Sequence, residues 1–126
     1  MDKPFRLDAR VRSFRYAFAG LRTVLATQHN AWIHSAVTAA VLAAGVAVGL
    51  SPPEWCWIVV AVLAVWATEA MNTAIEFLAD TVSTAPHPLA GQAKDCAAGA
   101  VLLAAVGAVA IGLLVFYPHA FALWHK

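Results

Sequence analysis

Three apolar stretches, each long enough to cross a lipid bilayer, constrain this chain more than any other feature. They run from about Trp32 to Leu50, from about Trp55 to Asp80 and from about Lys94 to Tyr117. A membrane-spanning helix needs about 20 predominantly apolar residues. Hydrophobic residues make up 62% of the chain and charged residues only 12%, whereas soluble domains are typically about 25% charged. We therefore expect an all-α membrane protein, with residues 1–126 forming a single integral membrane domain.

The segment before the first span has the pattern of a two-faced helix over residues 8–28. Apolar side chains recur at spacings of three and four, at Val11, Phe14, Phe18, Leu21 and Leu25, while arginines take other positions. A helix of this kind lies in the plane of the membrane interface. Because about 30 amphipathic residues precede the first span, we expect no cleaved signal peptide.

Polar segments separate the expected spans. The turn Ser51-Pro52-Pro53-Glu54 ends the first and can start the second, a polar connection covers residues 81–92, and the tail from Pro118 is expected at the interface. The two cysteines, Cys56 and Cys96, fall at opposite ends of expected spans. We therefore expect no disulfide between them and interpret both as small buried apolar residues.

The basic residues indicate how the chain is oriented in the membrane. Of eight Lys and Arg residues, six precede position 23, Lys94 follows the second connection, and only Lys126 falls on the other side. The positive-inside rule then places the N-terminus in the cytoplasm and the C-terminus on the opposite side of the membrane. The second connection faces the cytoplasm as well, so a nucleotide would arrive there. We expect no nucleic-acid partner.

The second span carries a stripe of polar side chains on one face. These are Glu69, Asn72, Glu76 and Asp80, and their spacings of three, four and four residues place them within a sector of about 80°. A helix that is leaving the membrane explains Asp80 and even Glu76. It does not explain Glu69, which lies about 17 Å deeper by the helix rise. Carboxylates at membrane depth are costly and mark functional sites.

Lys94 and Asp95 begin the third span, across the connection from Glu76 and Asp80. A Lys-Asp pair at a helix start is commonly a cap or an interfacial ion pair, but beside a carboxylate stripe it forms a candidate phosphate clamp. Carboxylates for Mg²⁺, a lysine for phosphate oxygens and a carboxylate that accepts a hydroxyl proton are what phosphoryl transfer requires. The glycine-rich phosphate loops are absent. His29, His34 and His87 lie on different elements without metal-ligand spacing, which favours structural or interfacial roles.

Several separated motifs resemble the prokaryotic diacylglycerol kinase family, which includes the undecaprenol kinases, over about residues 13–117. Residues 69–76, Glu-Ala-Met-Asn-Thr-Ala-Ile-Glu, followed by Asp80, are similar to the signature E-x-x-N-[ST]-A-I-E-x-x-x-D. His87 with Ala93-Lys94-Asp95 is similar to H-x-x-x-x-x-A-K-D. Phe14-Arg15-Tyr16-Ala17 resembles the surface helix, and Asn30 with His34 resembles the N-x-x-x-H of the undecaprenol kinase branch.

The resemblance implies a homotrimer of three-span subunits that share active sites and use MgATP to phosphorylate a lipid hydroxyl. It implies that Glu69 is the general base, that Asn72 helps to place the hydroxyl, and that Glu76 holds Mg²⁺. The residues that it implies for the nucleotide are Lys94, Asp95, Tyr16, Arg12 and His87, and Asp80, Asn30, His34 and Arg15 count as further polar positions. Where the family commonly has a second metal-binding glutamate, this chain has Gln28, which brings an amide oxygen without charge.

The acceptor and two other classes of function stay open at this point. We expect diacylglycerol as the acceptor, converted to phosphatidate, with undecaprenol as the alternative. Both stay possible because ATP and Mg²⁺ motifs carry no information on the lipid chain. Buried carboxylates also mark ion pathways, which would suit a small ion-coupled transporter, although the polar groups here gather at one end of the spans. A non-catalytic assembly protein would need neither Glu69 nor Lys94.

Overall fold

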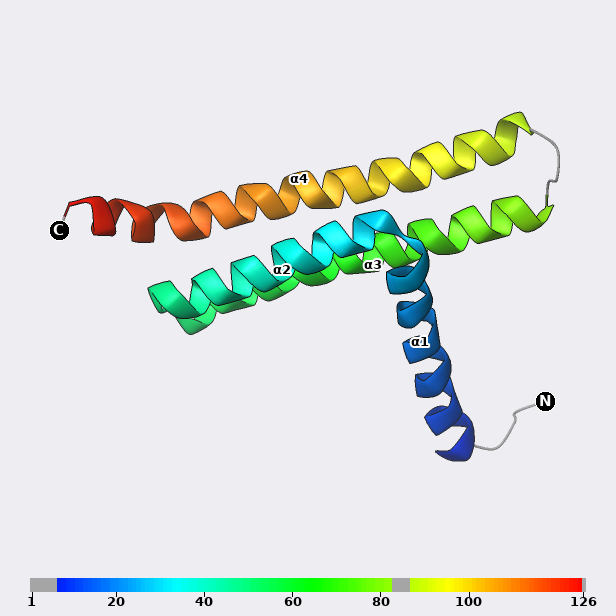
Figure 1. Cartoon of the computed structure of the whole chain (residues 1–126), viewed down its shortest axis with the longest axis horizontal. Helices are drawn as coiled ribbons and strands as arrows, with labels where there is room; N and C mark the ends of the chain where they lie inside the picture. The colour runs from blue at the N-terminus through cyan, green and yellow to red at the C-terminus, as the bar shows by residue number, and fades with distance from the viewer. Residues whose placement is uncertain (1–6, 83–86, 126) are drawn as a thin grey trace.

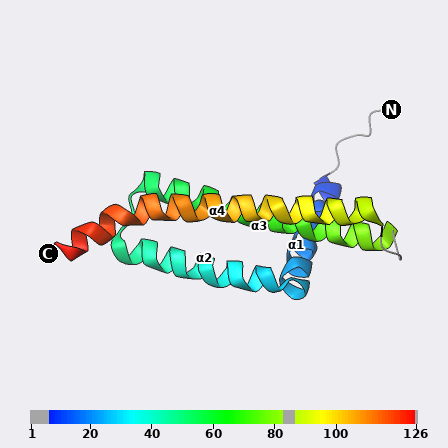
Figure 2. The same ribbon diagram turned by 90° about the horizontal axis from the view of Figure 1, so that it is seen from above.

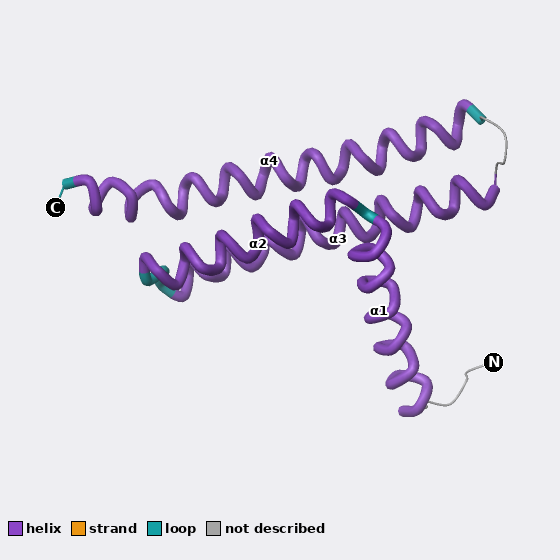
Figure 3. The backbone as a smooth tube through the Cα atoms, in the orientation of Figure 1, coloured by secondary structure: helices purple, strands orange, loops and turns teal. Residues whose placement is uncertain are grey.

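A computed structural model describes residues 7–82 and 87–125, which form four helices, without strands in these ranges (Figure 3). They are α1 (Leu7–Thr27), α2 (His29–Val48), α3 (Pro52–Val82) and α4 (Pro88–Trp124). The last three are long and apolar enough to cross a membrane. The predicted all-α architecture, with one helix followed by three long apolar helices, is confirmed.

Helices α2, α3 and α4 run alongside one another, while α1 leaves them to one side (Figures 1 and 2). The main packing is between the antiparallel helices α3 and α4, and α2 packs against α3. The α1–α2 corner lies toward the end of the bundle where α3 ends and α4 begins (Figure 1). The α2–α3 turn lies beside the C-terminal part of α4. The two ends of the bundle therefore differ in chemistry. The polar stripe of α3 lies at the end that holds the α1–α2 corner.

The turn between α2 and α3 is determined by glycine and by a capping box. Gly49 ends α2 in the left-handed conformation, at φ 70°, which residues with a Cβ adopt reluctantly. Gly45 is packed so closely that a Cβ would lie 2.8 Å from the Trp55 ring. Glu54 then accepts hydrogen bonds from the Ser51 backbone N–H at 2.7 Å and from the Ser51 hydroxyl at 2.6 Å. The bond to the backbone N–H is the glutamate half of the capping box expected of Ser-x-x-Glu at a helix start, and the Ser51 hydroxyl donates to the same carboxylate.

The same end of the bundle joins α3 to α4. Leu50, Ile58 and Val115 form a small buried cluster there. His119, on the last part of α4, lies with its Nε2 2.8 Å from Oε1 of Glu54. Glu54 thus links the α2–α3 turn with the end of α4.

Helix α4 extends beyond the expected third span, through Pro118 to Trp124, because a proline removes one backbone hydrogen bond without having to end a helix in apolar surroundings. Cys56 and Cys96 have no disulfide, as predicted, but both are exposed rather than buried. Each lies on a helix face that this single chain leaves uncovered.

Helix starts also differ from the predicted spans. α2 begins at His29 rather than Trp32, α3 begins at Pro52, and α4 begins at Pro88 rather than Lys94. The proline at the first position of α4 is favoured there because it needs no backbone partner, and His87 caps the helix. The polar connection is therefore shorter than the predicted 81–92. Pro86, which the sequence places in it, lies outside the described residues.

Candidate active site

The polar stripe of α3 descends from the solvent-exposed end of the helix into its buried middle. Asp80 is exposed, Glu76 is half-buried, and Asn72 is 6% exposed. Glu69 is fully buried at 0% exposure, the only charged residue in the buried core of the described chain. The predicted one-sided arrangement is confirmed, and the deepest member is a carboxyl group enclosed by protein.

Glu69 has no hydrogen-bond donor within reach of its side chain in the described part of the chain. Both carboxyl oxygens are buried without a partner, and so is Nε2 of His34. The hydroxyl of Thr73 bonds to the backbone carbonyl of Glu69 at 2.9 Å and so does not serve the carboxyl group. Buried polar atoms are nearly always paired, and an unpaired buried carboxylate is expensive. Glu69 is therefore set to receive a partner from outside the chain.

His34 is the group that lies nearest to this carboxyl. Its Nε2 is 3.7 Å from Oε2 of Glu69, and its side chain is 18% exposed. That separation exceeds the range of about 2.7–3.2 Å for a direct N–H···O bond. The sequence interpretation gave His34 a structural or interfacial role, and periodicity within one helix could not have shown that α2 brings it to Glu69.

Gln28 occupies the corner between α1 and α2 and reaches the stripe. It is the one residue between the two helices, with extended φ and ψ of −106° and 118°, and its side chain does not cap α2. Instead its Nε2 donates a hydrogen bond of 3.0 Å to Oε2 of Glu76. Gln28 thus lies at the predicted place, beside the carboxylate expected to hold the metal.

Glu76 is the centre of a small amide and carboxylate cluster. Its Oε1 accepts from Nδ2 of Asn72 at 3.0 Å, and its Oε2 accepts from Gln28. Among the described residues, no group of three or more His, Cys, Asp or Glu side chains is placed to hold a metal. Mg²⁺ in nucleotide enzymes commonly uses one or two carboxylates together with substrate phosphates. Glu76, with the side-chain amide of Gln28 beside it, can supply oxygen donors of that kind once the amide is rotated to present its oxygen.

Lys94 joins the stripe from α4. Its Nζ lies 2.8 Å from Oδ1 of Asp80 in a partly exposed ion pair, so the predicted approach of Lys94 to the end of α3 is confirmed. Asp95, the next residue, is exposed. His87 caps α4, its Nδ1 accepting from the Leu89 N–H at 3.3 Å.

The candidate nucleotide residues of α1 lie apart from this cluster. Arg12 pairs with Asp8 of its own helix at 3.0 Å, Tyr16 is 68% exposed, and Arg15 is exposed. The N-terminal part of α1 points away from the other helices (Figure 1). Asn30 is exposed in the first turn of α2. Within one chain, the structure thus gathers Gln28, His34, Glu69, Asn72 and Glu76 but not the α1 residues.

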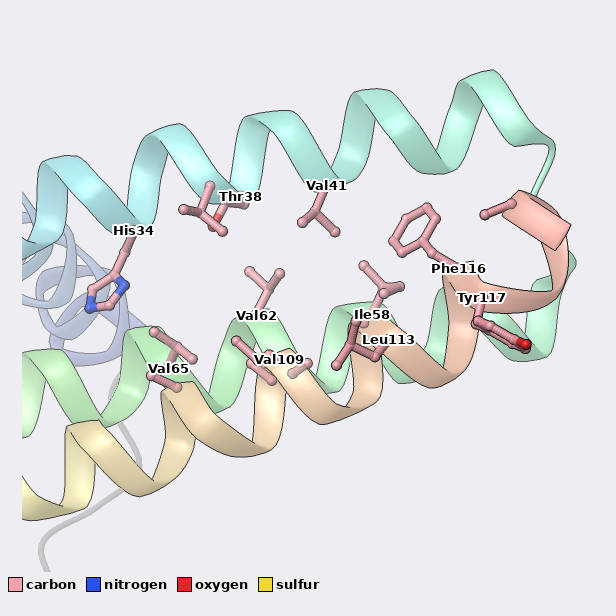
Figure 4. A pocket seen from close by; sticks show the side chains of 16 residues that line it. His34, Thr38, Val41, Ile58, Val62, Val65, Val109, Leu113, Phe116 and Tyr117 are labelled. Carbon is pink, nitrogen blue, oxygen red and sulfur yellow. The ribbon is translucent and has the colours of Figure 1, made fainter. Parts of the chain in front are cut away.

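An apolar cavity of about 610 Å³ begins at His34 and extends between α2, α3 and α4 toward the other end of the bundle (Figure 4). His34 points into the space between the helices, opposite Val65 (Figure 4). The lining is almost entirely aliphatic and includes Val41, Ile58 and Val62, and Phe116 and Tyr117 lie at the far end. No sequence pattern predicted this cavity, because its walls are apolar residues of the kind that any membrane helix contains.

The sequence matches a known family of enzymes. Residues 15–116 match the model of a family described as prokaryotic diacylglycerol kinase. The chain belongs to the prokaryotic diacylglycerol kinase family. It is 42% identical to the undecaprenol kinase of Bacillus subtilis (strain 168) over 117 residues, which cover 93% of this chain and 95% of the relative.

Two further relatives are named diacylglycerol kinase. The protein of Synechocystis sp. is 46% identical over 112 residues, which cover 84% of this chain and 61% of the relative. That of Escherichia coli (strain K12) is 32% identical over 119 residues, covering 86% and 89%. The chain is thus a lipid kinase of the membrane, rather than an ion-coupled transporter or a non-catalytic assembly protein, and its substrates are a lipid and a nucleotide phosphoryl donor.

Proposed function

We propose that this kinase transfers the terminal phosphoryl group of MgATP to the hydroxyl of diacylglycerol, giving phosphatidate, with undecaprenol as the alternative acceptor. The observation that carries the proposal is Glu69, a carboxyl group with 0% exposure and no partner for either oxygen. A general base must lie within hydrogen-bond reach of the proton that it removes. Glu69 lies where an alcohol coming from the apolar side of the site can meet it.

In the proposed reaction, Glu69 accepts the hydroxyl proton as the oxygen attacks the γ-phosphorus. A new O–P bond forms, the bond from the γ-phosphorus to the bridging oxygen breaks, and ADP leaves. Asn72, one helical turn closer to the exposed end, helps to place the acceptor, and its unpartnered Oδ1 is available to do so. Glu69 lies deeper than Glu76, which suits an acceptor from the bilayer and a donor from water.

Glu76 would hold Mg²⁺. The amide oxygen of Gln28 would be a second ligand after the side-chain amide rotates by about half a turn. The bound cation supplies charge neutralisation for the phosphoryl group in transfer. Lys94 would bind phosphate oxygens after exchanging its surface partner Asp80, which costs little because exposed ion pairs contribute little to stability. Asp95 and His87, near the start of the same helix, complete the nucleotide side.

The working enzyme in this proposal is a homotrimer with shared sites. Exposed Arg12, Arg15 and Tyr16 on α1 lie away from the stripe of their own chain, so they are available to a neighbouring subunit. The apolar face of α1, with Phe14 and Phe18 67% and 69% exposed, suits a helix lying on the cytoplasmic surface of the inner membrane. The C-terminus is then on the opposite side.

The lipid chain has an apolar space beside the base. The cavity that begins at His34 is of the size of small-molecule sites, about 300–1,000 Å³. Because the lipid chain already lies in apolar surroundings, packing against the cavity wall positions the chain without adding a hydrophobic driving force. Diacylglycerol and undecaprenol both offer such a chain, and relatives carry both names.

Phosphate transfer from radiolabelled ATP tests the acceptor directly. Purified protein is given a diacylglycerol and undecaprenol separately in identical detergent micelles. We expect labelled phosphatidate at the higher kcat/KM. Preferential labelling of undecaprenol would establish the alternative acceptor, and labelling of neither lipid would refute the proposed function.

A further inference from the structure

The side chains of His34 and Glu69 together have the hydrogen-bonding groups needed to bind one hydroxyl group. An ionised Glu69 needs a donor, and a neutral imidazole protonated at Nε2 needs an acceptor. A hydroxyl group is both at once. The two atoms lie 3.7 Å apart, both buried and both without a hydrogen-bond partner.

We propose that His34 is a hydroxyl-binding residue: its Nε2–H donates to the oxygen of the lipid alcohol while that hydroxyl donates to Oε2 of Glu69. A hydroxyl oxygen at about 2.8 Å from each atom fits after a small separation of the two side chains. This inference rests on the proposed role of Glu69 as base and adds to it the group that orients the acceptor. Neither motif spacing nor the polar stripe assigns that role to a residue of α2.

The surroundings of His34 support this direction of approach. His34 lies where the apolar cavity meets the polar stripe, so a hydroxyl held there has its hydrocarbon chain in the cavity (Figure 4). On the other side, Asn72 and Glu76 lead to the exposed end of α3. The bridge leaves one oxygen lone pair directed toward the nucleotide side as the proton moves to Glu69. His34 therefore acts by orientation, which contributes to rate as well as to affinity.

A graded set of substitutions at His34 tests the proposal. Glutamine carries an amide N–H at nearly the reach of Nε2, asparagine carries the same amide closer to the backbone, and leucine carries no donor. We expect His34→Gln to keep kcat/KM for the lipid within about threefold, whereas His34→Asn and His34→Leu lower it about tenfold or more. The KM for ATP should stay within about twofold in all three.

Radiolabelled ATP with a short-chain diacylglycerol and, separately, with undecaprenol provides the readout, so both sources of the hydroxyl are covered. Ser35→Ala is the matched control, because the Ser35 hydroxyl bonds only within its own helix, to the Ala31 carbonyl, and it should behave as wild type. Melting temperature in detergent is measured in parallel. If His34→Leu does not fold, the comparison of glutamine with asparagine decides.

Two results would overturn the inference. One is wild-type kcat/KM in both His34→Asn and His34→Leu. The other is a loss in which glutamine and asparagine are alike and the melting temperature and ATP affinity fall together, which is the behaviour of a structural ion pair. Glu69→Gln separates this failure from failure of the proposed function: if it stays inactive while the His34 variants are normal, only the role of His34 is lost.

Discussion

Gln28 donates a hydrogen bond of 3.0 Å to Glu76, although 48 residues separate them. The contact is possible because Gln28 forms the corner between α1 and α2 and directs its side chain at α3 instead of capping α2. The corner of the surface helix is thereby tied to the carboxylate that we assign to the metal. An amide occupies this place where the family commonly has a glutamate, so the charge of the site is open to test.

Gln28→Glu should lower the Mg²⁺ concentration that gives half-maximal activity by about threefold to tenfold, equivalent to about 0.7–1.4 kcal/mol. A second carboxylate beside Glu76 offsets more of the charge of a hard cation. Lipid phosphorylation measured against Mg²⁺ concentration in both proteins provides the comparison.

Thr27→Glu is the control for Gln28→Glu, since it adds the same charge one residue earlier, on a side chain whose hydroxyl bonds back to Thr23 at 2.9 Å. Its Mg²⁺ curve should superimpose on that of the wild type. Coinciding curves for Gln28→Glu and wild type would remove Gln28 from the metal site.

Lys94→Gln should raise the KM for ATP about tenfold or more, because it removes a charge-assisted bond to phosphate. Asp80→Asn, which removes only the present partner of Lys94, should change that KM by less than about threefold. The pair is compared by initial rates at saturating lipid. Equal losses in the two variants would show that the ion pair, and not contact with the nucleotide, is what matters.

Gly112→Phe should raise the KM for the lipid about fivefold or more while leaving the KM for ATP unchanged. Gly112 lines the cavity on α4, and a Cβ built on it meets no atom within 4 Å, so the new ring takes up space that we assign to the lipid chain. Gly107→Phe is the matched control on the same helix, also with open space at its Cβ but outside the cavity lining. A normal lipid KM in a folded Gly112→Phe protein would mean that the chain lies elsewhere.

His119→Leu should lower stability and leave phosphoryl transfer intact. The bond between His119 and Glu54 at 2.8 Å ties α4 to the α2–α3 turn, at the end of the bundle away from the stripe. Losing it should lower the melting temperature in detergent and leave kcat unchanged. A fall in kcat without a change in melting temperature would contradict a purely structural role.

Much of the site follows from the sequence because it lies on one helix. The spacing of Glu69, Asn72, Glu76 and Asp80 determines a common face, and the hydrophobic run around Glu69 determines its depth. Lys94 could be placed near Asp80 because a short connection joins their helices. Gln28 could be placed only through the resemblance.

Contacts between helices that are distant in the sequence could not be predicted, for physical reasons. The approach of His34 to Glu69 depends on how α2 packs against α3, and the Glu54–His119 bond depends on α4 continuing through Pro118. Periodicity gives the face of one helix but not its neighbour. The prediction that Cys56 and Cys96 are buried was wrong for the same reason, because an apolar residue in a membrane helix can face either protein or lipid.

Glu69→Gln tests the central claim most directly when phosphoryl transfer and MgATP binding are measured on the same purified protein. The change keeps the size of the side chain and removes the proton acceptor. We expect lipid phosphorylation to fall by about 10² to 10⁴, the range of general-base contributions, with the dissociation constant for MgATP within about twofold of wild type. Activity near that of wild type, or loss of MgATP binding in place of loss of transfer, would contradict the assignment of Glu69 as the base.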